Sequence, residues 1–192
     1  FFLALFLAHS QAVIIPVILG IKSFKKFDKN KKNNDLITFG FISFGLASLF
    51  EMIDHTKTAW IYVNHTSIFN WLFYSFLSLG LSSLSIAVIK NKLNIIFNLL
   101  LTFFSICSYL IFDKEISLLF QVILSTILII NWQRVFKDLL FVFYPIFGIF
   151  FTTFIGTNLS NSGNQIWHIF IGPCGTVSLL TFYLVLKRSE KK

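Results

Sequence analysis

The basic residues of this chain are confined to alternate gaps between its apolar stretches, and this alternation constrains the fold more than any other feature. Fourteen of the 16 Lys and Arg residues lie in the first, third and fifth gaps or in the C-terminal tail. Only Lys57 and Lys114 lie in the remaining gaps. Cytoplasmic loops of membrane proteins collect Lys and Arg. The pattern therefore predicts a membrane protein whose N-terminus lies outside and whose C-terminus is cytoplasmic.

The apolar stretches themselves have the length of membrane-spanning helices, which need about 20 residues to cross the hydrocarbon core. They cover approximately residues 1–21, 36–53, 66–89, 93–112, 116–132, 139–155 and 166–186. The connections between them are short, so successive helices are expected to run antiparallel. The sequence thus predicts an all-α fold, a seven-transmembrane-helix bundle that forms one integral membrane domain over residues 1–192.

Composition agrees with this expectation, because 56% of the 192 residues are hydrophobic and only 12% are charged. The formal charge of +8 is typical of nucleic-acid binding, but here the cations flank apolar spans. Their expected counter-charge is the anionic inner leaflet. We therefore predict membrane lipids as partners, with no nucleic acid and no soluble partner. The expected location is the plasma membrane, or the inner membrane if the source is bacterial.

Polar residues inside the predicted spans gather toward the outer side. Glu51, Asp54 and His55 are spaced i, i+3 and i+4, so they share one face at the end of the second span. An ionisable residue inside a span is costly and usually faces the bundle interior or a cavity. We therefore expect Glu51 to face the interior of the bundle.

The other spans supply further polar residues at the same side. His9 lies in the first span, and Asn164 and His168 are four residues apart at the start of the seventh. The third span begins near His65 and carries a polar stripe at positions 67, 70, 74 and 78, which includes Asn70 and Tyr74. We expect these residues to converge with Glu51 and His55 on one polar site.

Two kinds of chemistry fit such a site. Histidine nitrogens and carboxylate oxygens bind zinc, and three protein ligands with an open position activate a water molecule. The expected ligands are His168, either His55 or Glu51, and one of His9 and His65, with Asn164 orienting His168 or the water through a hydrogen bond. Alternatively, the same residues relay protons or hold a cationic solute without any metal.

One segment resembles a known family. The run Gly45-Leu-Ala-Ser48-Leu-Phe-Glu51-Met-Ile-Asp54-His55, together with Asn164-Gln-Ile-Trp167-His168, is similar to the alkaline ceramidase superfamily. That superfamily also includes the progestin and adiponectin receptors and the Per1 proteins. The resemblance implies seven membrane helices and a zinc site that is built from a helix-two histidine and an H-x-x-x-H pair on helix seven.

The resemblance also implies roles for residues of this chain in the hydrolysis of a lipid amide. His168 matches the second histidine of the pair, and Asn164 occupies the first position. Met52 stands where the helix-two histidine is expected, so His55 or Glu51 would replace it. Ser48 matches a helix-two serine of the family, whereas Asp54 lies earlier than the aspartate that the family has near helix three. Together with the polar stripe, the catalytic candidates are Ser48, Asn70 and Asp54, with Ser48 or Asn70 holding the developing oxyanion and Tyr74 supporting the site by a hydrogen bond.

The residues leave a second class of function open. A receptor, a transporter or an accessory membrane subunit would use the same polar cluster to bind a ligand or a proton, without catalysis. Zinc bound in stoichiometric amount would favour the metal-dependent lipid hydrolase over these alternatives.

Overall fold

The described part of the chain consists of helices joined by short connections. The computed structural model describes residues 2–26, 33–57, 67–112, 114–151, 154–155 and 167–190. Six long helices are found there: α1 (Phe2–Lys26), α2 (Asn34–Lys57), α3 (Ile68–Ile86), α4 (Lys92–Ile111), α5 (Lys114–Phe136) and α8 (Trp167–Ser189). These described residues include no strand, which confirms the all-α fold class. By length and apolar composition, these six helices could each cross a membrane.

The sixth apolar segment is a distorted helix rather than the regular span expected over residues 139–155. It consists of a 3-10 turn η1 (Leu139–Val142), a short helix α6 (Phe143–Pro145) and a π-helical stretch η2 (Ile146–Phe151). Pro145 lacks an N–H group, so one backbone hydrogen bond of a regular helix is missing at this point. Within the described residues, the continuous apolar helical segment covers Leu139–Phe151, which is shorter than each of the six long helices.

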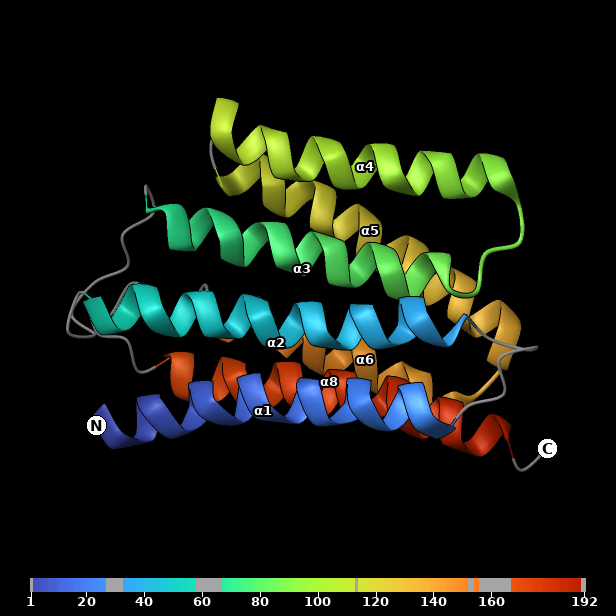
Figure 1. Cartoon of the computed structure of the whole chain (residues 1–192), viewed down its shortest axis with the longest axis horizontal. Coiled ribbons are helices and arrows are strands. Elements are labelled where there is room, and N and C mark those ends of the chain that lie inside the picture. The colour runs from blue at the N-terminus through green and yellow to red at the C-terminus, as the bar shows by residue number, and fades with distance from the viewer. Residues whose placement is uncertain are drawn as a thin grey trace.

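The helices lie roughly antiparallel in a bundle in which α2 and α3 are central (Figure 1). Helix α2 packs between α1 and α3, and α3 also contacts α4 and α5. Helix α8 packs against α1 on one side and against α6 and η2 on another. Small residues permit the closest of these contacts: a Cβ at Gly45 of α2 would lie 2.8 Å from the Val17 side chain of α1.

Basic residues gather at one end of this bundle. Helix α1 begins at the left in Figure 1 and α8 ends at the right. At the right-hand end, which we call the lysine-rich end, α1, α3, α5 and α8 end and α4 begins. The basic residues in or beside these helix ends are Lys22, Lys90, Lys92, Arg134, Lys137, Lys187 and Arg188. The fold thus brings the described cations of the odd-numbered gaps and of the tail to one end, as the loop pattern requires.

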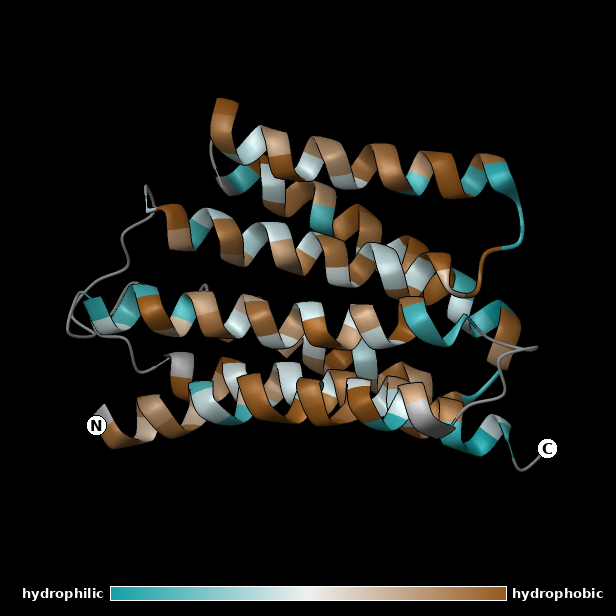
Figure 2. Ribbon diagram, viewed as in Figure 1, coloured by the Kyte–Doolittle hydropathy of each residue, from teal (hydrophilic) through white to brown (hydrophobic). Residues whose placement is uncertain are grey.

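The bundle exposes apolar side chains and buries polar ones. Phe97, Phe103 and Phe104 of α4 are half or more exposed, at 54%, 60% and 50%. Asn98 and Ser105 of the same helix are fully buried. In Figure 2, most of the helix length is brown, the colour of hydrophobic residues. This arrangement is stable in lipid, where buried polar groups bond across helices and apolar groups face the hydrocarbon. The structure therefore agrees with a protein that spans the membrane.

Candidate functional site

Two histidines and a glutamate meet where α1 packs on α2. The His9 Nε2 atom lies 3.7 Å from Glu51 Oε2, and the His55 Nε2 atom lies 3.9 Å from Glu51 Oε1. The two imidazole rings meet edge to face with centroids 5.4 Å apart. One ligand atom from each of the three residues lies within 4.8 Å of the others. We call His9, Glu51 and His55 the HEH cluster.

Local helix geometry sets the positions of these side chains. Glu51 and His55 lie one turn apart on α2, so they share a face. The His9 ring is oriented by its Nδ1 atom, which lies 2.9 Å from the backbone oxygen of Leu5 in the preceding turn of α1. A bond to a carbonyl requires Nδ1 to carry the proton. In neutral His9, the Nε2 atom that faces Glu51 is then the ring's acceptor.

The HEH cluster is shielded from solvent. The side chains of His9 and His55 are only 4% and 1% exposed, and that of Glu51 is 19% exposed. This burial does not distinguish zinc binding from the binding of a proton or a cationic solute. It does place Glu51 toward the bundle interior, as its position in a span suggested. Buried ionisable groups are retained where they pair with each other or with a ligand. The cluster can hold a proton, a cation or a metal ion.

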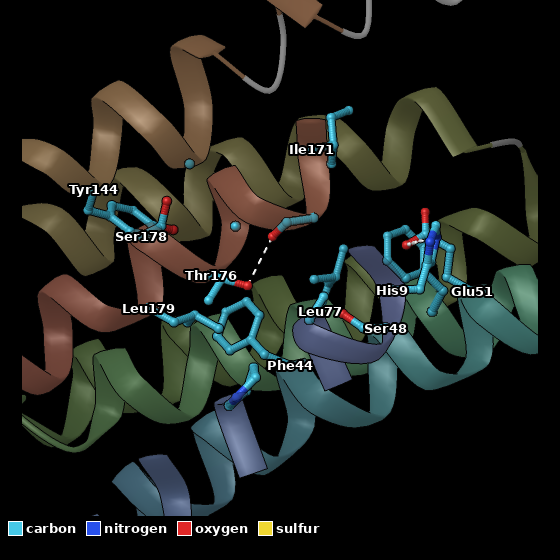
Figure 3. Close-up of a pocket in the computed structure, with 16 residues that line it drawn as sticks. His9, Phe44, Ser48, Glu51, Leu77, Tyr144, Ile171, Thr176, Ser178 and Leu179 are labelled. Carbon is cyan, nitrogen blue, oxygen red and sulfur yellow. Dashed lines mark hydrogen bonds and ion pairs between the residues drawn. The ribbon is translucent and has the colours of Figure 1, made fainter. Parts of the chain in front are cut away.

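A cavity of about 210 Å³ extends from the HEH cluster into the bundle. His9 and Glu51 lie toward one end of the lining and Tyr144 and Ser178 toward the other, with Ser48 and Thr176 between these ends (Figure 3). Most of the other lining side chains are apolar, namely Ala12, Pro16, Phe44, Phe73, Leu77, Ile171 and Leu179. The cavity thus has a mostly apolar lining, with polar groups at both ends and two hydroxyl groups between them.

The hydroxyl groups of the cavity wall on α8 bond within their own helix. Thr176 donates to the Gly172 backbone oxygen at 3.0 Å, and Ser178 donates to that of Cys174 at 2.9 Å. Gly175 also lines the cavity, and a Cβ built on it would meet no atom within 4 Å. The small residues of α8 therefore leave the space that a side chain would otherwise occupy.

A comparison with known protein families gives a match over the whole chain. A family model described as a seven transmembrane receptor matches residues 1–192. The chain belongs to this seven transmembrane receptor family. No curated protein and no solved structure shows significant similarity to it. The family, together with the six long apolar helices, confirms an integral multi-pass membrane protein.

The receptor family differs from the family that the sequence motifs suggested. It supports the seven-helix membrane protein that the resemblance implied, but it lends no support to the alkaline ceramidase superfamily or to hydrolysis of a lipid amide. It agrees instead with the receptor among the alternatives.

Asp54 lies beside the HEH cluster in sequence but has a different contact. Helix α2 continues to Lys57, beyond the expected end at residue 53, so Asp54 is part of the helix and is 2% exposed. The Ser67 hydroxyl donates to Asp54 and accepts a hydrogen bond from the Asn70 backbone N–H at 3.0 Å. Asp54 therefore secures the first turn of α3 through the residue that caps it.

The polar stripe of α3 shares a face, as expected, and apart from the bond of Ser67 to Asp54 of α2, its described side-chain bonds to other helices are with α4 and α5. Tyr109 of α4 donates to the Asn70 side chain, and Gln121 of α5 donates to the Tyr74 backbone oxygen at 3.0 Å. Ser78 bonds to Ser105 of α4 at 2.8 Å. Neither Asn70 nor Tyr74 belongs to the HEH cluster or to the lining of the cavity. Of the three catalytic candidates, only Ser48 lines the cavity.

Three predicted site residues cannot be placed with the others. His65 and Asn164 lie outside the described residues. His168 is in the first turn of α8, but its side chain lies outside the described part of the structure. Its role as a ligand stays a prediction.

Several residues of the site were not expected from the sequence. Phe44, Tyr144, Thr176 and Ser178 line the cavity, yet each is an ordinary residue of a membrane helix. The only sequence pattern that marks this region is the small-residue run Gly172-Pro-Cys-Gly175. Such runs commonly mark close helix contacts, so the pattern alone does not distinguish a contact from a cavity.

Proposed function

We propose that this protein is a membrane receptor that binds one small ligand in the cavity between α1, α2, α3, the sixth segment and α8. The observation that carries the proposal is the cavity itself, because most of its lining belongs to helices that could cross a membrane. Ligand sites in proteins are mostly apolar concave spaces with a few convergent polar groups, and this cavity has that composition. The chain belongs to a seven transmembrane receptor family, which supports a receptor as the class of function.

The lining indicates the chemistry of the ligand. An apolar cavity of about 150 Å³ holds benzene, so a cavity of about 210 Å³ suits a molecule of about ten non-hydrogen atoms. Phe44, Phe73 and Leu77 favour an apolar body. Glu51 at one end favours a cationic or hydrogen-bond-donating group on the ligand. We therefore expect a compact apolar molecule with one such group.

The position of the cavity suggests how binding would be transmitted. The ligand would contact α1 and α2 on one side and α8 on the other, and Tyr144 and Gly148 of the sixth segment also line the space. Interrupted π-helical stretches such as η2 are frequent at functional sites. A ligand that contacts these elements together stabilises the arrangement in which they all reach it, and so shifts the conformational population.

We further propose that the lysine-rich end faces the cytoplasm, with the N-terminus outside. The support is the gathering of basic residues at one end of the bundle and the rule that cytoplasmic ends collect Lys and Arg. The HEH cluster then lies nearer the outer leaflet.

Filling the cavity tests the receptor proposal. Gly175→Leu places a side chain in the open space, while Val177→Leu makes a similar change at a position on α8 that is 38% exposed. Organic extracts of the purified wild type and both variants are compared by mass spectrometry. We expect a compound that is retained by wild type and Val177→Leu and depleted at least tenfold in Gly175→Leu. Equal amounts of every compound in all three proteins would contradict the proposal.

Hydrolysis of a lipid amide is the second candidate, and one observation favours it. Ser48 lines the same cavity as His9 and Glu51, so a hydroxyl lies in the same space as groups that could activate water. The test is release of fatty acid from a lipid amide by wild type and by Ser48→Ala. Equal background release by both would remove this candidate.

A further inference from the structure

We propose that the HEH cluster binds a divalent transition-metal ion of the Zn²⁺ class through His9, Glu51 and His55. The ligand set differs from the one expected from the sequence, because it joins α1 to α2 and does not depend on α8. The inference rests on the geometry of the cluster and does not require that the cavity holds an organic ligand.

The distances in the cluster are close to those of a metal site. Zn²⁺ binds histidine nitrogen and carboxylate oxygen at about 2.0–2.2 Å, which sets tetrahedral ligand atoms about 3.3 Å apart. The two His–Glu pairs are separated by 3.7 and 3.9 Å. Each pair therefore needs to close by only about 0.5 Å. The widest separation among the three ligand atoms is at most 4.8 Å, so it would need to close by up to about 1.5 Å for tetrahedral binding.

The surroundings of His9 favour a metal ligand. Metal-binding histidines usually donate their second ring N–H to a carbonyl or carboxylate, which fixes the ring and its tautomer. The Nδ1 atom of His9 has such a contact with the Leu5 backbone oxygen at 2.9 Å, and its Nε2 atom faces Glu51 at 3.7 Å. The ring is thus already held with its Nε2 atom directed toward Glu51.

The charge of the cluster favours a cation. A carboxylate inside a membrane span is costly unless it is compensated, and Glu51 has an imidazole on each side. Neutral imidazoles carry no charge to balance the carboxylate, whereas a divalent ion bound to all three residues more than balances it. Two histidines and one carboxylate suit Zn²⁺ and other borderline divalent ions, and are poor ligands for Ca²⁺ or Mg²⁺.

Three protein ligands leave a fourth position of a tetrahedral ion open. Because His9 and Glu51 both line the cavity, this position is reached from the cavity, and we expect a water molecule there. The site would then be accessible from the same space that the proposed ligand occupies.

Cobalt binding tests the site directly. The full-length protein in detergent is treated with EDTA, dialysed and titrated with Co²⁺, which reports tetrahedral binding by its visible absorption. We expect one Co²⁺ per wild-type chain, displaced by Zn²⁺. His9→Gln, Glu51→Gln and His55→Gln each remove a ligand and should weaken binding at least tenfold, since loss of an outer hydrogen-bond partner alone costs about 10–100-fold. Circular dichroism and gel filtration confirm that each variant tested is folded.

Matched controls separate the cluster from the other ionisable residues. Glu115→Gln, His65→Gln and His168→Gln should retain Co²⁺ binding with an affinity within a factor of about three of wild type. No Co²⁺ binding by wild type would overturn the proposal. Unchanged binding in folded His9→Gln, or its loss in His168→Gln, would overturn the assigned ligands. Gly175→Leu should keep the metal, so failure of the cavity proposal is distinguishable from failure of the metal site.

Discussion

His9 of α1 and Glu51 of α2 approach to 3.7 Å across the contact between two helices that could each cross a membrane. They are 42 positions apart in the chain, and His55 joins them from the next turn of α2. This approach turns two separated polar residues of a mostly apolar chain into a buried cluster at the end of a cavity. The protein's proposed receptor and metal sites both depend on it.

Removing the Glu51 carboxylate should destabilise the bundle. Glu51→Leu leaves His9 and His55 without the carboxylate between them, and interhelical polar contacts in membranes contribute about 0.6–2 kcal/mol. We expect a loss of similar size, measured as a lower midpoint of thermal unfolding in detergent. Glu115→Leu, at an exposed position on α5, is the control. An equal or higher midpoint for Glu51→Leu would show that the cluster does not stabilise the fold.

Two glycines on the same helix should respond oppositely to alanine. A Cβ at Gly172 would lie 2.8 Å from the Ala8 backbone oxygen, whereas one at Gly175 would meet nothing within 4 Å. Gly172→Ala should therefore force α8 away from α1 and cost about 1–3 kcal/mol. Gly175→Ala should be neutral or stabilise the helix by up to about 1 kcal/mol. Unfolding midpoints of the two variants measure the difference, and the same effect in both would contradict the packing of α1 on α8.

Gln121 of α5 should stabilise the contact with α3. Its amide donates to the Tyr74 backbone oxygen at 3.0 Å and to the Ser78 hydroxyl at 3.1 Å. Gln121→Leu should cost about 0.6–2 kcal/mol, whereas Gln133→Leu on the exposed face of the same helix should cost less than about 0.5 kcal/mol. Comparable losses in both variants would argue that the two bonds contribute nothing specific.

The contact between Asp54 and Ser67 should behave as one coupled unit. Ser67→Ala removes both the cap of α3 and the donor to Asp54, and loss of a cap costs about 1 kcal/mol. Asp54→Asn should cost less in the Ser67→Ala background than in wild type, because the partner is already gone. The measurement is a double-mutant cycle of unfolding free energies. Strict additivity would show that the two residues do not interact.

The orientation in the membrane should follow the basic residues. We expect a cysteine introduced at Lys29 to be labelled only from the cytoplasmic side, and one at Ser160 only from outside, after the native Cys107 and Cys174 are replaced by serine. The reason is the excess of Lys and Arg in the gap that contains Lys29. Labelling of position 29 from outside the cell would reverse the topology.

The membrane class and the helical fold follow from the sequence alone, and so does part of the site. Apolar segments of about 20 residues become helices in lipid because every backbone group must be bonded within the segment. The shared face of Glu51 and His55 follows from the same local rule, since four residues make about one turn. The sixth segment departs from the expected regular span, although Pro145 marks the position where it does.

Only the tertiary structure decided which polar residues meet. His9 and Asn70 were expected to converge with Glu51, yet only His9 does so, while Asn70 bonds to Tyr109 of α4. A helix in lipid has no aqueous face, so its sequence pattern says little about which side faces which neighbour. That choice is made by close packing at small residues such as Gly45 and Gly172 and by hydrogen bonds between helices. Both depend on the rotation and spacing of whole helices, which residues in separate spans determine jointly.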